Sequence, residues 1–178
     1  MVHIVTPRLE LVAAEPPIAQ AEADGVQGWC APLDVEPPGS WPPPLNEHAT
    51  LAWFADAITK EPEAIGWFAW YVLCRRPRAL IGQAGFKGRP DDRGTVELGY
   101  SLLPSSQGRG FGTELVRALT MWAFSHEAVD RVMADTYPEF VSSVRVLEKN
   151  RFTLNGRADE PGAVRYELRR SMVELTRQ

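Results

Sequence analysis

The sequence of 178 residues contains only two cysteines and three histidines, and neither set is clustered. Cys30 and Cys74 lie far apart, as do His3, His48 and His126, so their spacing forms no metal-ligand motif. Two thiols without a disulfide framework fit a reducing compartment. We therefore expect a cytoplasmic protein that holds no metal.

Long apolar runs and an excess of positive charge are also missing. No stretch of about 18 apolar residues occurs, and no basic segment followed by an apolar one opens the chain. We therefore expect neither a membrane partner nor export. The net charge is −4, which argues against a nucleic-acid partner and mildly favours a cationic substrate. The length suits one domain with a sizeable core, which we expect to span residues 1–178.

A glycine-rich stretch is the most informative feature that is present. It reads Gln107-Gly108-Arg109-Gly110-Phe111-Gly112 and is followed by Thr113. Without Cβ atoms, the backbone at these glycines can adopt positive φ and direct consecutive N–H groups at one point. A helix that begins here adds the positive end of its dipole, and Arg109 adds a charged donor. The pattern predicts a phosphate or diphosphate site, with a plain glycine-rich turn before a helix as the alternative.

The spacing of these glycines excludes two common phosphate-binding motifs. A P-loop requires a lysine before the final serine or threonine, whereas Gly112 precedes Thr113 here. A dinucleotide-binding fingerprint requires Gly-x-Gly-x-x-Gly, whereas this stretch is Gly-x-Gly-x-Gly. The remaining form, Gln-x-x-Gly-x-Gly after a strand and before a helix, resembles the pyrophosphate loop of the GCN5-related N-acetyltransferase (GNAT) family, which binds coenzyme A there.

Three flanking segments carry the same resemblance. Glu97-Leu-Gly-Tyr100 before the loop is similar to the fourth strand of the family. Ser143-Val-Arg-Val-Leu-Glu-Lys-Asn-Arg-Phe152 resembles the Ser-x-Arg-Val-x-Glu-Lys-x-Gly-Phe segment of the subgroup typified by ribosomal-protein N-terminal acetyltransferases. Thr6-Pro-Arg-Leu-Glu-Leu11 resembles the opening strand of that subgroup.

Two positions depart from the family pattern. Phe140 stands where the family usually carries an asparagine that contacts the pantetheine arm. Arg151 stands where the family has a glycine, so the residue must either adopt positive φ or the helix before it must end differently.

The resemblance implies an acetyl-CoA-dependent N-acetyltransferase that acts on a primary amine, which is a protein N-terminus, a small amine or an amine-bearing antibiotic. It also implies that backbone N–H groups near Leu102 and Leu103 bind the pantetheine arm. A coenzyme A sensor without catalysis and an acyltransferase that uses a longer acyl group are the alternatives. The sequence leaves a homodimer open.

Candidate catalytic side chains come from two of these segments. Glu97 is our candidate general base, with a solvated carboxylate paired to a lysine or arginine as the alternative. Glu167 and Asp135 are weaker candidates. Ser143 is our candidate contact for cofactor and leaving thiolate, with a packing role as the alternative. Trp41 is the candidate acceptor contact, because an indole face can hold a cation.

Hydrophobic periodicity predicts a mixed α/β fold. It is a twisted sheet of about six to seven strands with helices on both faces, as the family resemblance also implies. The expected strands are 8–13, 66–74, 79–87, 95–103, 131–136, 152–157 and 163–170. The expected helices are 48–60, 113–124 and 140–150. Segment 31–45, with six prolines, is expected to be an extended loop.

Overall fold

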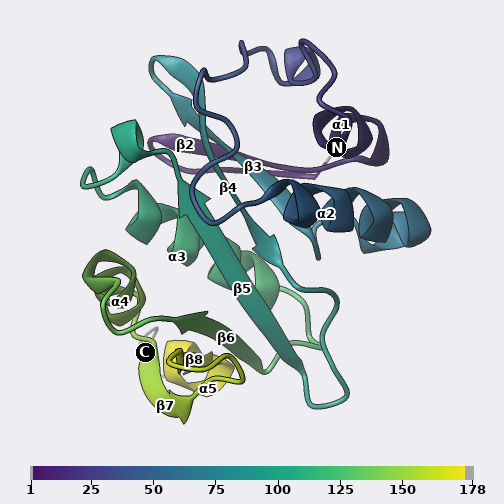
Figure 1. Ribbon diagram of the computed structural model, residues 1–178. Helices are drawn as coiled ribbons and strands as arrows, with labels where there is room; N and C mark the ends of the chain where they lie inside the picture. Colours follow the sequence, from purple (N-terminus) through teal and green to yellow (C-terminus); the bar gives the residue numbers. More distant parts are fainter. Residues whose placement is uncertain (1, 175–178) are drawn as a thin grey trace. The chain divides into compact units, whose positions relative to one another are not determined.

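The computed structural model describes residues 2–174; Met1 and residues 175–178 of the expected domain lie outside the described residues. The fold is mixed α/β, as expected (Figure 1), and its strand order is β1-β2-β3-β4-β5-β6-β8-β7. The strands are β1 His3–Val5, β2 Leu9–Ala13, β3 Ala69–Arg75, β4 Arg78–Phe86, β5 Thr95–Leu102, β6 Arg131–Thr136, β7 Thr153–Arg157 and β8 Val164–Arg169. The helices are α1 Pro16–Ala23, α2 His48–Lys60, α3 Phe111–Phe124, α4 Val141–Lys149 and α5 Arg170–Glu174, and short 3₁₀ turns are η1 Ala31–Leu33, η2 Pro62–Ala64 and η3 Pro104–Ser106.

The chain divides into two compact units that share β5. The first unit extends to Gly85 and includes Tyr100–Phe111, and the second comprises Phe86–Gly99 and the chain from Gly112 onward. Each unit therefore contains one end of β5 and part of the predicted site.

The first unit is built on antiparallel pairing of β1 with β2, β2 with β3, and β3 with β4. The central strand β3 includes Trp70, Tyr71 and Val72, which are all fully buried. The nearly continuous apolar run of residues 66–74 explains this burial, because a strand covered on both faces needs no polar alternation. The strand begins three residues later than expected, since the Trp67 N–H donates to the Ala64 carbonyl in a turn.

The proline-rich segment 31–45 contains one 3₁₀ turn, η1, and otherwise forms the expected loop. Polar contacts with the sheet fix its end. The Asn46 amide donates to Gln83 Oε1 on β4 at 2.6 Å, and the Ser101 hydroxyl on β5 donates to the Pro44 carbonyl. The loop therefore lies against the sheet of the first unit.

The second unit combines one parallel and two antiparallel pairings. β5 pairs with β6 in parallel over Thr95–Glu97 and Arg131–Met133, while β8 is antiparallel to both β6 and β7. Leu98 and Gly99 of β5 lie beyond the last parallel pair. Leu115 and Leu119 of α3 are fully buried, and the helix covers the range 113–124 expected from its hydrophobic periodicity.

Residues 2–174 contain eight strands rather than the expected six to seven, because His3–Val5 forms a further edge strand. Three residues are too few to show the alternation by which a strand is recognised in sequence. Helix α1 was also not anticipated. It is eight residues long and opens on two prolines, which favour a first helical turn but also a loop.

Arg151 ends α4 in the left-handed conformation, with φ of 67°. Its N–H donates to the Glu148 carbonyl, and the Phe152 N–H donates to the Leu147 carbonyl at 3.1 Å. Leu147 and Phe152 are both buried. These bonds and the apolar pair define a Schellman motif, in which arginine occupies the position that usually belongs to glycine.

We expect Arg151→Gly to raise the free energy of unfolding by about 1 kcal/mol, because a residue with a Cβ is strained at this φ. Urea denaturation should show a higher midpoint with an unchanged slope. Arg157→Gly, in the exposed strand β7, is the control and should not stabilise the protein. An equal or lower midpoint for Arg151→Gly would contradict the strained cap.

Candidate active site

The glycine-rich stretch forms a loop between η3 and α3. Gly108 and Gly110 have φ of 71° and 78°, as the sequence predicts, whereas Gly112 lies inside the helix. A Cβ built on Gly108 would meet nothing within 4 Å. The two loop glycines are therefore required by backbone conformation rather than by crowding, and the surface beside Gly108 is open.

Hydrogen bonds from two side chains hold this loop in place. The Gln107 amide donates to the Leu102 carbonyl at 2.9 Å, which ties the loop to the end of β5. Arg8 Nη1 donates to the Arg109 carbonyl at 2.9 Å. The guanidinium groups of Arg8 and Arg109 lie 4.8 and 5.0 Å from the centroid of the Phe111 ring. Sequence reasoning missed Arg8 because 101 residues separate it from its partner.

The backbone at the end of β5 corrects one expectation. The Leu103 N–H donates to the Ile81 carbonyl at 2.8 Å, so it is not available to a pantetheine arm. Successive strand residues direct their backbone groups to opposite sides, so the Leu102 N–H points away from β4. Of the two predicted donors, only Leu102 keeps the required direction.

Glu97 lies on β5 in the second unit, with 22% of its side chain exposed and its carboxylate paired with the Lys87 ammonium. Its neighbours Val96 and Leu98 are buried, so they lie on the opposite face of the strand from Glu97. An ion pair with lysine is the structural alternative that the sequence had left open. The role of Glu97 as a general base stays a prediction.

Ser143 lies in the first turn of α4, also in the second unit. Its side chain is half-buried, and its backbone N–H donates to the Phe140 carbonyl at 2.8 Å. The same helix reaches α3, because the Asn150 amide donates to the Thr113 carbonyl at 3.2 Å. This hydrogen bond joins the C-terminal end of α4 to the first turn of α3, and the thiolate role of Ser143 stays a prediction.

Phe140, which replaces the expected asparagine, precedes α4. The residue is 38% exposed, and its ring packs edge-to-face on that of Tyr137, with centroids 5.4 Å apart. A phenyl ring offers no hydrogen bond like that of an amide, so any contact of this side chain with a ligand is apolar.

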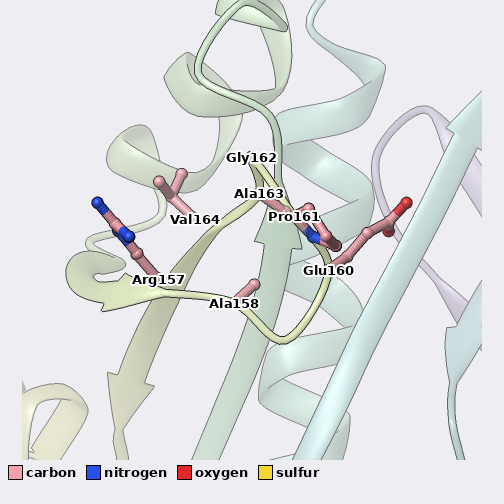
Figure 2. A pocket seen from close by; sticks show the side chains of 7 residues that line it. All are labelled: Arg157, Ala158, Glu160, Pro161, Gly162, Ala163 and Val164. Carbon is pink, nitrogen blue, oxygen red and sulfur yellow. The ribbon is translucent and has the colours of Figure 1, made fainter.

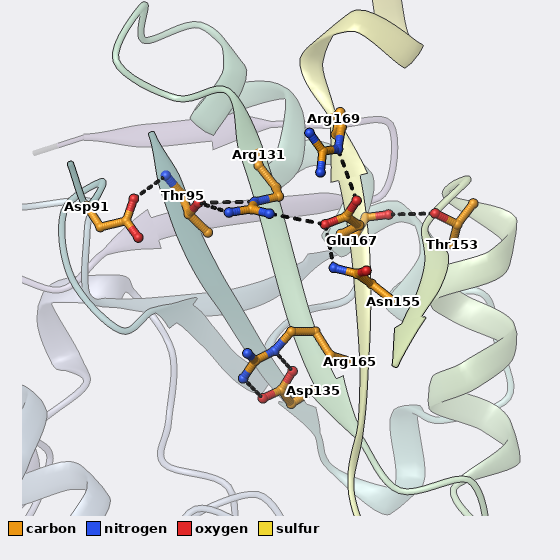
Figure 3. A network of polar contacts seen from close by, with 9 residues as sticks. All are labelled: Asp91, Thr95, Arg131, Asp135, Thr153, Asn155, Arg165, Glu167 and Arg169. Carbon is orange, nitrogen blue, oxygen red and sulfur yellow. Dashed lines mark hydrogen bonds and ion pairs between the residues drawn. The ribbon is translucent and has the colours of Figure 1, made fainter. Parts of the chain in front are cut away.

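The weaker base candidates, Asp135 and Glu167, each take part in polar contacts between strands β6, β7 and β8 (Figure 3). Arg165 binds both oxygens of Asp135, at 2.9 and 2.8 Å. Glu167 accepts from Asn155 at 2.7 Å and from Arg169 at 3.0 Å. Both carboxylates are therefore already paired with guanidinium groups of this sheet, and their role as a base stays a prediction.

Trp41 lies beside a buried carboxylate. Its indole N–H donates to Glu22 Oε1 at 2.8 Å, and its ring lies 5.5 Å from that of Trp29. Glu22 is 7% exposed and also accepts from the Tyr71 hydroxyl at 2.7 Å and from the Gln83 amide at 3.4 Å. The polar edge of Trp41 is therefore bonded within the protein, and only its ring face is left for the predicted acceptor contact.

Burial of Glu22 raises its pKa above the ordinary 4.5, although its three donors oppose the shift. The folded state then favours the protonated form, so the contribution of Glu22 to stability is full below pH 4.5 and falls as the pH rises through the raised pKa. Between pH 4 and 7, we therefore expect the free energy of unfolding of the wild type to fall relative to that of Glu22→Gln. Parallel curves in urea titrations at each pH would contradict this.

A surface pocket of about 640 Å³ lies at the turn between β7 and β8 (Figure 2). Its two charged residues, Arg157 and Glu160, point in opposite directions, so they do not converge on one ligand. None of the predicted site residues lines it.

Within residues 2–174, no group of three or more histidine, cysteine, aspartate or glutamate side chains could hold a metal ion. In the same part of the chain, no helix has the length and apolar character needed to cross a membrane.

Comparison with known proteins shows where this chain belongs. The family model for the acetyltransferase (GNAT) domain matches residues 14–153 of this chain. The uncharacterized N-acetyltransferase YjdG of Bacillus subtilis (strain 168) is 28% identical over 160 residues, which cover 90% of this chain and 95% of the relative. Aminoglycoside N(6')-acetyltransferase type 1 of Serratia marcescens is 32% identical over 119 residues, which cover 65% of this chain and 56% of the relative.

A solved structure agrees with these sequence matches at the level of the fold. RimL, the ribosomal L7/L12 alpha-N-protein acetyltransferase in complex with coenzyme A, has a TM-score of 0.66 at 21% identity and covers 93% of this chain and 96% of its own. The family match includes the glycine loop, Glu97 and Ser143. The resemblance found in the sequence is confirmed: this chain belongs to the GNAT family and is an N-acetyltransferase.

Proposed function

We propose that the protein transfers the acetyl group of acetyl-CoA to a primary amine. The observation that carries this proposal is the loop at Gly108 and Gly110, whose positive φ values precede the N-terminus of α3. Peptide N–H groups and a helix dipole suit a diphosphate, which coenzyme A provides. RimL, whose fold is similar, is solved with coenzyme A.

The proposed reaction joins an amine nitrogen to the thioester carbonyl. The C–N bond forms, the C–S bond breaks, the amine proton goes to a base, and the thiolate of coenzyme A leaves and is protonated. Loop residues Gln107–Thr113 would hold the diphosphate, and the Leu102 N–H would hold the pantetheine arm. Glu97 would accept the proton, directly or through water, and Ser143 would donate a hydrogen bond to the departing sulfur.

For the acceptor, we propose a cationic amine. The net charge of −4 favours such a molecule. One relative is an aminoglycoside acetyltransferase, and RimL modifies a ribosomal protein. Both a polyamine-like antibiotic and a protein N-terminus are therefore acceptors to test.

The test is release of coenzyme A from acetyl-CoA in the presence of kanamycin, spermidine or a peptide with a free N-terminus. We expect release of coenzyme A to depend on the amine for at least one acceptor. Mass spectrometry should then show an added acetyl group on the amine of that acceptor. Binding of acetyl-CoA without turnover on any amine would favour a sensor. Faster turnover of a longer acyl-CoA would favour the other alternative.

Replacement of the candidate serine tests its proposed role. Ser143→Ala should lower kcat by about 10- to 100-fold, because a hydrogen bond to a charged group contributes roughly 1.5–3 kcal/mol. Affinity for coenzyme A should change little, since the bond forms fully only with the thiolate. Ser142→Ala, at the exposed neighbouring position of α4, is the matched control. Wild-type turnover in Ser143→Ala would assign this serine to packing.

A further inference from the structure

Arg8 reaches the glycine loop from a segment with no assigned role in the site. Its Nη1 donates to the Arg109 carbonyl at 2.9 Å. Its guanidinium lies 4.8 Å from the centroid of the Phe111 ring, which begins α3. Its Nη2 would be 3.4 Å from a Cβ built on Gly110. One side chain thus contacts Arg109 and Phe111 and lies beside Gly110 between them.

The segment that presents Arg8 is itself rigidly held. The Arg8 carbonyl accepts from the Arg75 N–H on β3 at 2.9 Å. The Thr6 hydroxyl and the Leu9 backbone form reciprocal bonds of 3.1 and 2.9 Å. The Arg75 guanidinium donates to the Thr6 carbonyl at 2.9 Å. Arg8 therefore begins from a fixed backbone position, so its bond to the loop fixes the loop relative to β3.

The geometry of the peptide bond gives this contact a consequence. In a trans peptide, the carbonyl oxygen of one residue and the N–H of the next point in opposite directions. A donor on the Arg109 carbonyl therefore sets the direction of the Gly110 N–H, which points away from Arg8. A positive donor on that oxygen also polarises the peptide and makes its N–H a stronger donor.

We infer that Arg8 is a positioning residue for the diphosphate of coenzyme A, an inference that rests on the proposed function. By binding the Arg109 carbonyl, it holds the Gly110 N–H in the direction that an anion requires before the anion arrives. Gly110 accepts any peptide orientation without Cβ strain, so an external group must select one. Preorganisation of this kind raises affinity by removing the cost of ordering the loop.

The test compares a cofactor with and without its diphosphate. Arg8→Gln should raise the Kd of coenzyme A by about tenfold in calorimetry, which corresponds to one well-placed hydrogen bond to a charged group. The kcat/KM for acetyl-pantetheine, which lacks the diphosphate, should stay at the wild-type value. Arg8→Lys, which keeps one charged donor, should restore part of the affinity for coenzyme A.

Arg78→Gln is the matched control, since Arg78 also donates to a backbone carbonyl, that of Leu33, at 2.9 Å. This variant should not change the affinity for coenzyme A relative to the kcat/KM for acetyl-pantetheine. Arg8→Gln could instead weaken the binding of coenzyme A and lower the kcat/KM for acetyl-pantetheine equally, or change neither. Either result would show that the positioning role is wrong, while the proposed function stands. If the wild type does not bind coenzyme A, the proposed function itself fails, and this inference with it.

Discussion

Gly110→Val should weaken the binding of coenzyme A at least about 100-fold while the protein stays folded. The glycine has φ of 78°, a conformation that costs an L-residue roughly 1–2 kcal/mol and suits a β-branched side chain least. Relief of that strain reorients the adjoining peptide groups. Loss of two N–H bonds to a charged diphosphate, each contributing about 1.5–3 kcal/mol, accounts for the expected loss of affinity.

Titration calorimetry with coenzyme A measures this change, and circular dichroism checks the fold. Gly25→Val is the matched control, because Gly25 also has positive φ, at 65°, and has open space where a Cβ would lie. It should show the same backbone strain with wild-type affinity for coenzyme A. Wild-type affinity in Gly110→Val would place the cofactor elsewhere.

Gly85→Ala should destabilise the protein by at least about 3 kcal/mol, the upper part of the usual range for overpacking. Gly85 lies on β4, and a Cβ built on it would be 2.0 Å from the Phe68 carbonyl oxygen and 2.8 Å from the carbonyl carbon. Both atoms belong to the backbone, so no change of rotamer relieves the overlap. The Phe68 backbone, which leads into β3, and β4 must move apart locally.

The control for this change is the same substitution on the next strand. A Cβ on Gly99 of β5 would meet nothing within 4 Å, so Gly99→Ala should be neutral or stabilise the protein by about 0.5–1 kcal/mol. Urea denaturation of both variants gives the comparison. A Gly85→Ala protein within 1 kcal/mol of the wild type would contradict the close approach of Phe68 to β4.

Local patterns allowed much of the fold to be predicted. Helix α2 and strand β6 have the predicted bounds because their apolar periods continue to both ends of each element. The positive φ values of Gly108 and Gly110 were also predictable, since three alternating glycines have few other uses. The three-residue β1 and the proline-initiated α1 carry too little periodicity to be recognised.

The parts of the site that escaped prediction depend on distant contacts. The Leu103 N–H is taken by Ile81 because of the register between β4 and β5, which no local motif encodes. Arg8 meets Arg109 only after the chain has folded over 101 residues. Sequence reasoning therefore identified the elements and the loop but not which of their donors remain available.

The two cysteines have a practical consequence for measuring catalysis. Cys30 and Cys74 are both free and buried, with hydrogen bonds to the Val35 and Arg76 carbonyls, and burial raises the pKa of the Cys30 thiol. A colorimetric thiol reagent added during turnover should therefore react with the released cofactor before it reaches the enzyme. In the absence of substrate, the rate at which the same reagent labels the two cysteines measures how often the first unit opens locally, because each sulfur is accessible only when the residues around it separate.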